Sequence, residues 1–263
     1  MIDAHTHLYS DEYRHDLAQV IRRARSILKG VVISAVDIDS LEQSLAIRRR
    51  HPDFIYVTAG IHPRKTAALL AEDRQQLWEA IDRVRPDIVA LGEIGPDFHY
   101  IRNRREQQRQ LAVLEEALDR AEAWNLPLVV HARRAEAAAL EVLSRSKVPV
   151  MFHCFAGSRQ VAEKITACGF YLSLSAILLF NAELQDAVKG IPIEQILTET
   201  DSPALSPKRG LLRNEPAYVE MIVLHLAKLL KFPPHRIAEI TSANTRRFYG
   251  LEQKKLVDLK QKS

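Results

Sequence analysis

Six residues that bind divalent metals well lie at the ends of separate apolar runs of this chain. The runs, with the polar residues that end them, read IDAHTHL, IVALGEIG, PLVVHARR, VPVMFHCF and ILTETDSP. Imidazole and carboxylate groups are common ligands of divalent cations in proteins. Strand-like runs that end in such groups predict one metal site to which several strands contribute, and the candidate ligands are His5, His7, Glu93, His131, His153 and Asp201.

Strand-like and helix-like segments alternate along the chain. Eight runs rich in Val, Ile and Leu have the composition of buried strands, and they cover residues 1–5, 30–36, 54–61, 87–93, 126–131, 148–153, 169–175 and 194–200. Alternation of this kind predicts βαβ units and a parallel sheet. Helical patterns lie between and after these runs, for example at residues 12–29, 105–125, 215–231 and 233–250.

Eight units favour a closed (β/α)8 barrel of the TIM type, an α/β fold, over an open doubly wound sheet. The first strand is not followed by the Gly-rich fingerprint of a dinucleotide-binding sheet. No linker, low-complexity tract or repeat divides the sequence. We therefore expect a single domain over residues 1–263, with 251–263 as a short basic C-terminal tail. The carboxyl ends of barrel strands form one mouth where catalytic groups gather, so all six candidate ligands are expected there.

The first strand carries two candidate ligands, and a third is expected to return to it. His5 and His7 are two residues apart, so their side chains face the same way on a strand. In a closed barrel the eighth strand pairs with the first, which brings Asp201 beside them. Asp201 is also a candidate catalytic base for a nucleophilic water. The alternative for the two histidines is simple hydrogen bonding, and Glu199 is expected deeper in the barrel.

The middle strands supply the remaining candidates. Glu93 ends the fourth run, and its carboxylate can bridge two cations, although a buried salt bridge is the alternative. His131 and His153 end neighbouring strands about 4.8 Å apart and can share one ion. His62, in AGIHPRK, is a candidate catalytic residue that steadies charge or protonates a leaving group. It is a weaker candidate as a ligand, and the alternative is a loop histidine before Pro63.

Cations follow several strand ends and are expected to ring the mouth. Guanidinium groups suit phosphate, so the cations favour an anionic substrate, with solvated loop charges as the alternative. The formal net charge, 37 − 33 = +4, permits an anionic partner and is equally compatible with simple solubility. We predict that Arg133 contacts the scissile phosphate and Arg134 a neighbouring one. The cations are Arg64, Lys65, Arg133, Arg134, Lys208, Arg209 and Arg213, of which Arg64, Arg133, Arg134 and Arg209 are predicted to bind substrate.

The composition is that of a globular protein, with 263 residues of which 47% are hydrophobic and 27% charged. No signal peptide or membrane-length apolar run is visible, so we expect a cytoplasmic protein, and we take a monomer as the default. Cys154 and Cys168 lack the spacing of a disulfide framework and are expected to be buried thiols. Because Cys154 directly follows His153 on a predicted strand, its side chain is expected to face away from the metal.

Motifs along nearly the whole chain resemble those of the TatD-like metal-dependent hydrolases, a family of the amidohydrolase superfamily. The resemblance extends from residue 2 to about residue 250. The combination is specific, although each piece alone is short. The matching motifs are DAHTHL at 3–8, GIHP at 60–63, ALGEIGPD at 90–97, VVHARR at 129–134, HCFAG at 153–157 and ETDSP at 199–203, with RGLLRNEP at 209–216 and SANTRRFYG at 242–250.

The resemblance implies a (β/α)8 barrel with a divalent metal site, often with two ions. Family members are deoxyribonucleases, notably Mg²⁺-dependent 3′→5′ exonucleases, and some relatives are linked to RNA or to D-aminoacyl-tRNA deacylation. Three departures lie near the expected rim: EIGPDF stands where the family reads EIGLDY, Arg134 replaces an acid, and SLSAIL replaces a serine-glycine pattern. The implied ligands are His5, His7, Glu93 and Asp201 for one ion, and Glu93, His131 and His153 for the other.

The leading hypothesis is a metal-dependent hydrolase, most simply a deoxyribonuclease of the 3′→5′ exonuclease type. It would cleave phosphodiester bonds through a metal-activated water, with Asp201, Glu93 and His62 as catalytic residues. The expected cofactor is divalent Mg, Mn or Zn, with two ions per chain, and the expected partner is nucleic acid, DNA rather than RNA. One alternative is an ester or amide hydrolase such as a D-aminoacyl-tRNA deacylase with the same metal site. Another is a non-catalytic binding module on an enzyme-like barrel.

Overall fold

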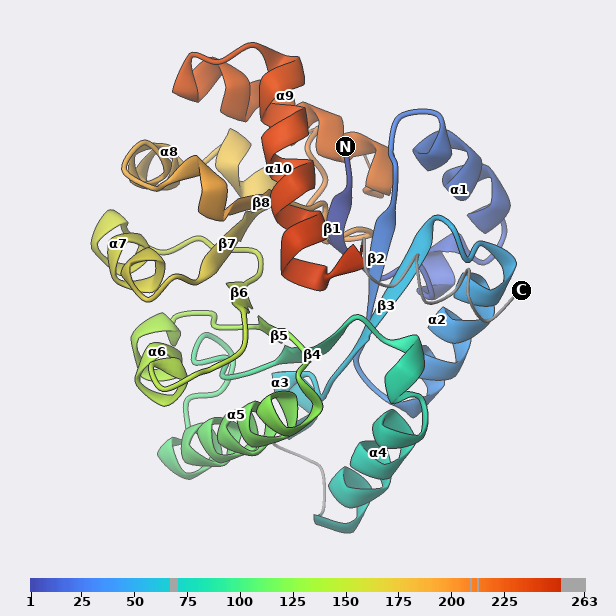
Figure 1. The fold of residues 1–263 in the computed structure, drawn as a ribbon, viewed down its shortest axis with the longest axis vertical. Coiled ribbons are helices and arrows are strands. Elements are labelled where there is room, and N and C mark those ends of the chain that lie inside the picture. The colour runs from blue at the N-terminus through green and yellow to red at the C-terminus, as the bar shows by residue number, and fades with distance from the viewer. Residues whose placement is uncertain (67–70, 209, 212, 252–263) are drawn as a thin grey trace.

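The chain folds around one sheet of eight parallel strands, hydrogen-bonded in chain order from β1 to β8. The computed structural model describes residues 1–66, 71–208, 210–211 and 213–251. Helices surround the sheet on its outside (Figure 1). The strands are β1 Asp3–Thr6, β2 Val31–Ala35, β3 Ile55–Ala59, β4 Ala90–Ile94, β5 Leu128–Val130, β6 Val150–Phe152, β7 Tyr171–Leu174 and β8 Ile196–Thr198.

The segment that follows β8 closes the sheet into a barrel. Thr6 forms a parallel bridge with Ser202. The backbone N–H of Asp201 donates to the carbonyl of His5 at 3.0 Å, and that of His7 donates to the carbonyl of Ser202 at 2.7 Å. Beneath these bonds, the buried Asp3 carboxylate accepts from the N–H and hydroxyl of Thr200. The predicted eight-stranded (β/α)8 barrel is confirmed.

The helices occupy the segments where helical patterns were predicted, but two begin later. Residues 11–13 form a 3-10 turn, because the Tyr13 hydroxyl donates to the Asn214 carbonyl and Arg213 donates to the Glu12 carbonyl. Residues 216–218 form another such turn before α9. The helices are α1 Leu17–Arg25, α2 Ile38–Arg50, α3 Pro63–Thr66, α4 Ala71–Arg83, α5 Arg104–Trp124, α6 Glu136–Leu143, α7 Arg159–Ala167, α8 Ala182–Val188, α9 Val219–Leu230 and α10 Pro234–Tyr249.

Two apolar cores hold the barrel. The larger one lies between the strands and the surrounding helices. The smaller one contains side chains from the strands together with Phe248, Tyr249 and Leu251. The Tyr249 hydroxyl donates to the carbonyl of Ala4 at 2.9 Å, which anchors the end of α10 to the first strand. The carboxyl ends of the strands are thereby left to form the site.

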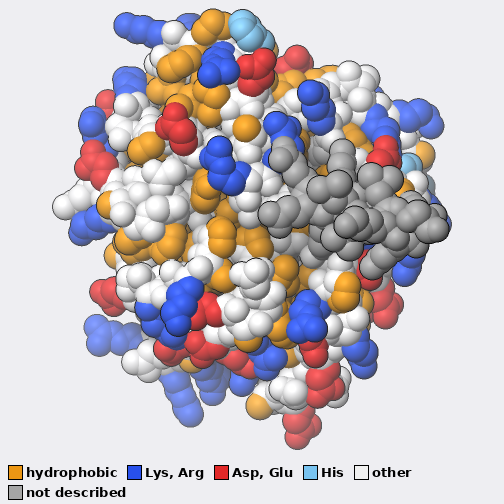
Figure 2. Space-filling view, viewed as in Figure 1, with side chains coloured by type: hydrophobic (Ala, Val, Ile, Leu, Met, Phe, Trp, Pro, Cys, Tyr) orange, Lys and Arg blue, Asp and Glu red, His pale blue; other side chains and the backbone are white. Residues whose placement is uncertain are grey.

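The surface carries mixed charge, and no helix among the described residues is both long and apolar enough to cross a lipid bilayer. On the face drawn in Figure 2, Lys and Arg side chains are spread out and interspersed with Asp and Glu. The described Lys and Arg side chains are therefore not gathered into one patch on that face.

Strand β4 approaches β5 unusually closely, and two glycines make this possible. The register between the strands shifts between Leu91 and Ile94. Gly92 and Gly95 have φ values of 121° and 143°, which side chains rarely tolerate. A Cβ atom at Gly92 would lie 2.2 Å from the carbonyl oxygen of Val129. The irregularity allows the strand to turn Glu93 into the barrel mouth.

We predict that Gly92→Ala lowers the free energy of unfolding by about 3 kcal/mol, because it combines backbone strain with a backbone clash. Gly169→Ala is the matched control: Gly169 also has a positive φ, of 77°, but an added Cβ would meet no atom within 4 Å. Its expected cost is about 1 kcal/mol, from strain alone. Urea unfolding of both variants measures the difference, and equal losses would contradict the steric argument.

Candidate metal centre

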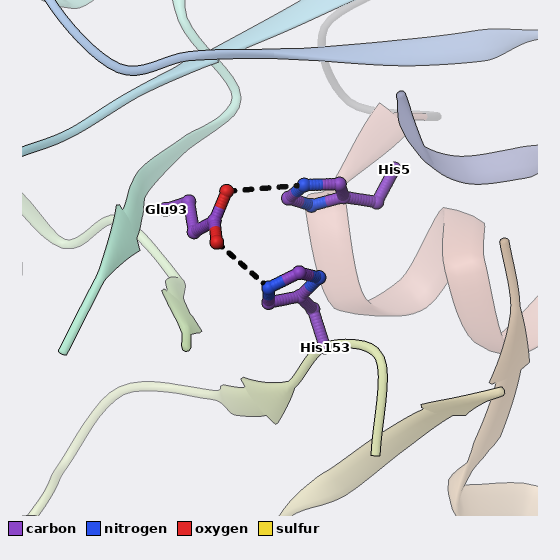
Figure 3. Close-up of side chains that lie close together, drawn as sticks. All are labelled: His5, Glu93 and His153. Atoms are coloured by element: carbon purple, nitrogen blue, oxygen red, sulfur yellow. Dashed lines mark hydrogen bonds and ion pairs between the residues drawn. The ribbon is translucent and has the colours of Figure 1, made fainter. Parts of the chain in front are cut away.

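The Glu93 carboxylate lies at the centre of the barrel mouth, surrounded by five histidines. Its side chain is almost fully buried, and Figure 3 shows it between His5 and His153. Its neighbours come from four different strand ends, those of β1, β3, β5 and β6, as the alternation of strands and helices predicted. The nitrogen–oxygen distances are 3.5 Å from His5 Nε2 and 3.8 Å from His7 Nε2 to Oε2, and 3.4 Å from His62 Nε2, 2.6 Å from His131 Nδ1 and 2.9 Å from His153 Nε2 to Oε1.

The two oxygens of Glu93 therefore face two different groups of side chains. Oε2 faces His5 and His7, whereas Oε1 faces His131 and His153, with His62 beside them. Three overlapping sets of these residues hold potential ligand atoms within 4.8 Å of one another. Such an arrangement could hold a divalent metal ion.

Asp201 joins the first of these groups, as barrel closure predicted. Its Oδ1 lies 3.2 Å from His7 Nε2 and 3.8 Å from His5 Nε2. The residue has a left-handed φ of 54° while its N–H remains bonded to the carbonyl of His5. All six predicted ligands thus converge on one place, although Asp201 lies almost two hundred residues from His5 in the chain.

Three of the histidines are oriented by an acceptor on the ring nitrogen that points away from Glu93. His7 Nδ1 lies 3.0 Å from the Ser34 carbonyl, a group that only accepts. His131 Nε2 lies 3.1 Å from Asp97 Oδ2. When the outer ring nitrogen, which points away from Glu93, donates its proton to such an acceptor, the inner nitrogen keeps a lone pair. That lone pair can bind a cation. His153 follows the same pattern, with Nδ1 placed 3.3 Å from Glu199 Oε1.

His62 has the opposite arrangement. Its Nδ1 accepts a hydrogen bond from the backbone N–H of Arg64 at 3.2 Å, so in the neutral ring Nε2 carries the proton. That nitrogen faces Glu93 Oε1. His62 is therefore placed as a proton donor inside the site, which distinguishes it from His131 and His153.

The cluster of carboxylates draws positive charge into the site. Burial favours the neutral carboxyl of Glu93, but the charges of His153 and His62 and a hydrogen bond from His131 outweigh it, so its pKa lies well below the usual range. Burial also disfavours protonated His153, yet Glu93 and Glu199 raise its pKa well above the usual value. For Asp201, burial is outweighed by His7, and the pKa of the carboxyl is again lowered. Protons and metal cations therefore compete for the same nitrogens.

A buried ring nitrogen in the centre lacks a hydrogen bond among the described residues. His5 Nε2 is enclosed and makes no hydrogen bond to any residue within the described ranges. A buried polar atom left in this way costs about 1–3 kcal/mol, and its nearest carboxylate oxygens are 3.5 and 3.8 Å away. A cation between His5 and these carboxylates would satisfy it. The mixed imidazole and carboxylate donors also suit a divalent ion, so the residues present fit a metal.

Sequence reasoning missed one residue and misplaced others. Asp97 is almost fully buried and holds His131, and its position four residues after Glu93 in ALGEIGPD was the available signal. Cys154 was expected to face away from the metal, but it lines the site cavity because its φ of 47° breaks the alternation of the strand. Cys168 was expected to be buried and is exposed.

The predicted ring of cations is only partly at the mouth. Arg133 lines the cavity, and its guanidinium lies 5.1 Å above the ring of Tyr100, while that of Arg64 lies 5.0 Å from the same ring. Arg134 is exposed and does not line the cavity.

Arg213 was expected at the mouth, but Asp16 and Glu215 hold it by ion pairs. The side chain of Lys65 and all of Arg209 fall outside what the structure describes, and Lys208 lies 5.8 Å from the Tyr218 ring.

Comparisons with known proteins agree with this geometry. The sequence profile of the TatD-related DNase family matches residues 2–250. An uncharacterised metal-dependent hydrolase TatD of Mycobacterium tuberculosis is 34% identical over 264 residues, covering 95% of this chain and 98% of the relative. A 3′-5′ ssDNA/RNA exonuclease TatD of Rahnella sp. is 31% identical over 267 residues, covering 97% and 100%. The crystal structure of a TatD family hydrolase from Entamoeba histolytica has a TM-score of 0.87 at 20% identity, covering 95% and 97%.

The fold and the site define a metal-dependent hydrolase built on a (β/α)8 barrel. Within that class, the chain belongs to the TatD-related DNase family. The resemblance inferred from the motifs is thereby confirmed. The crystal structure from Entamoeba histolytica supports the fold alone, because its sequence identity is low.

We predict that Mn²⁺ stabilises the metal-free protein, because it satisfies His5 Nε2 and neutralises the buried carboxylates. At a hundred times its dissociation constant the gain is about 2.7 kcal/mol, measured as a rise in Tm. Glu93→Gln should lose most of this rise. Glu42→Gln, at an exposed position of α2, should keep it. An equal rise in both variants would contradict a central role for Glu93.

Proposed function

We propose that this chain is a divalent-metal-dependent nuclease that hydrolyses phosphodiester bonds at the 3′ ends of single-stranded nucleic acid, with DNA favoured over RNA. One observation carries the proposal: a single buried carboxylate presents its two oxygens to two groups of metal-binding side chains in one cavity. Paired cations are typical of enzymes that cleave phosphodiester bonds. The name of the Rahnella relative, a 3′-5′ ssDNA/RNA exonuclease, supports the substrate class.

Glu93 would be shared by two cations. Its Oε2, with His5, His7 and Asp201, would hold one of them. Its Oε1, with His131 and His153, would hold the other. When bound, divalent cations polarise a phosphate oxygen and lower the pKa of a ligated water from 15.7 to about 7. The imidazoles favour Zn²⁺ or Mn²⁺, whereas the carboxylates also accept Mg²⁺.

Asp201 and His62 would handle protons on opposite sides of the site. Asp201 lines the cavity as an ionised carboxylate, and its oxygens can accept a proton from a water beside the substrate. His62 Nε2 carries a proton that it can donate to the departing oxygen or to a charged phosphate oxygen. In these roles, Asp201 would be the base and His62 the acid on either side of the scissile bond. General acid–base hydrolysis uses such a pair.

The cavity suits the end of a strand. Its volume is about 260 Å³, which is slightly below the usual range for small-ligand sites. Phe155, Ile177 and Leu205 form an apolar wall that can contact a base or sugar, and Arg133 supplies a cation for phosphate. A space of this size accommodates one terminal nucleotide rather than a duplex. The relatives' names favour this nuclease over the deacylase alternative.

We predict that the metal-stripped protein shortens a single-stranded oligonucleotide from its 3′ end only after a divalent cation is restored. Glu93→Gln should lower kcat at least about 100-fold, since it removes the charge between the two groups of ligands. The assay compares Mg²⁺, Mn²⁺ and Zn²⁺ on DNA, RNA and aminoacyl-tRNA. Turnover of the aminoacyl ester without nuclease activity, or wild-type turnover in Glu93→Gln, would refute the proposal.

We predict that Arg133→Ala lowers kcat on an oligonucleotide about tenfold, because it removes a cation from the cavity where charge develops on the phosphate. Arg134→Ala is the matched control, since the neighbouring arginine is exposed outside the cavity. It should leave kcat unchanged and alter KM at most, through a phosphate outside the cavity. If both variants reduced kcat equally, Arg133 would not have the proposed role.

A further inference from the structure

Three hollows follow the site cavity, and each shares lining residues with the next. The site cavity shares His7 and His62 with a shallow hollow at the rim, which is also lined by Tyr9 and Arg64. Tyr9 in turn lines the upper part of a groove between the β1–α1 segment and α2. Helices α1 and α2 follow one another around the barrel in Figure 1. The site and the groove are thus connected through shared residues.

The lower part of the groove is the larger one, with a volume of about 520 Å³. Arg14 and Arg50 line both its upper and its lower part, one from each side. Arg22 of α1 adds a third guanidinium in the lower part. All three side chains are exposed. The groove therefore presents three exposed guanidinium groups.

None of these three arginines has an acidic partner among the described residues, whereas several arginines close to them do. Within the described ranges, neither Arg14, Arg22 nor Arg50 forms an ion pair. On the same two helices, by contrast, other arginines are paired with carboxylates: Arg23 with Glu215, Arg25 with Asp53 and Arg48 with Asp87. Unpaired guanidinium groups in a row are available for an external anion.

The acids that line the groove do little to cancel this charge. Asp16 accepts hydrogen bonds of 2.7 Å from both terminal nitrogens of Arg213, so the negative charge of Asp16 is already balanced. Asp11 is the other acid of the lining, at the upper end. Two histidines, His15 and His51, lie in the lower part and add hydrogen-bond donors. The three arginines of the lining therefore outnumber its two acids, Asp11 and Asp16.

We propose that this groove binds the single-stranded nucleic-acid chain that trails from the metal centre, with Arg14, Arg22 and Arg50 contacting successive backbone phosphates. The proposal rests on the nuclease function and extends it to an additional substrate-binding surface. Cations along a groove that opens from the active site are typical of single-strand binding, which follows the backbone and not the base sequence. The protein therefore holds a long strand more tightly than a short one.

The double variant Arg14→Gln/Arg50→Gln tests the groove by direct binding. The metal-loaded protein is titrated into a fluorescent single-stranded oligonucleotide with phosphorothioate linkages that resist cleavage, and anisotropy gives Kd at several salt concentrations. Loss of two phosphate contacts should weaken binding about tenfold and reduce the slope of log Kd against log salt by about 1.4. Circular dichroism establishes that the variant is folded.

The matched control is Arg49→Gln/Arg83→Gln, which removes the same charge. Both of these arginines are exposed, form no ion pair with a described residue and lie outside the groove, and Arg49 directly precedes Arg50 on α2. The control should bind the oligonucleotide as the wild type does. Equal Kd values for the two double variants would overturn the proposal. So would a loss of binding to anionic phosphatidylserine vesicles while oligonucleotide affinity stays unchanged, since the groove would then serve a lipid surface.

A small substrate separates this proposal from the nuclease function itself. A nitrophenyl ester of thymidine 5′-phosphate reaches the metal centre but not the groove, so the groove variant should hydrolyse it at the wild-type rate while KM for a long strand rises. A matching fall in turnover of the ester would overturn the proposal, because the substitutions would then act on the site. If the wild type hydrolysed no phosphodiester, the nuclease function would fail, while the anisotropy result would still decide the groove.

Discussion

The buried negative charge of Glu93 is the constraint on which the rest of this site depends. A carboxylate enclosed at a barrel mouth loses several kcal/mol of hydration unless nearby positive charge replaces it. Five histidines surround this one, and its two oxygens divide them into two groups. Since the imidazoles are themselves partly or fully buried, the cluster is stable only with protons or metal cations among them. Affinity for divalent metal is therefore built into the burial of Glu93.

A layer of hydrogen-bond acceptors behind the histidines fixes which ring nitrogen faces the centre of the cluster. Asp97, Glu199 and the Ser34 carbonyl each bond the outer nitrogen of one ring. Each bond fixes a tautomer, so the inner nitrogen is directed to the centre as a lone pair. His62 has its outer nitrogen occupied by a backbone donor instead. Histidine thus directs a lone pair to the centre at three positions and an N–H at one, and the difference lies in a single hydrogen bond.

The distribution of arginines connects the site to its surroundings. Arginines that are paired with carboxylates stabilise the fold, as Arg213 does where it joins Asp16 and Glu215 behind the barrel closure. Three arginines without acidic partners within the described ranges lie along the proposed path of the substrate, Arg133 in the cavity and Arg14 and Arg50 in the groove. The net charge of +4 does not reveal this division, because the effect of each arginine depends on where it lies.

Residue types and short-range patterns determined the barrel and the convergence of its ligands. Apolar runs of strand length and a ligand at the end of each are local features, and closure of eight strands then requires Asp201 to meet His5 and His7. The tertiary structure alone decided which nitrogen of each histidine faces the centre, that Arg213 is held by Asp16, and that Cys154 turns into the cavity. These features rest on contacts between residues far apart in the chain and on one left-handed backbone angle, and strand periodicity encodes neither.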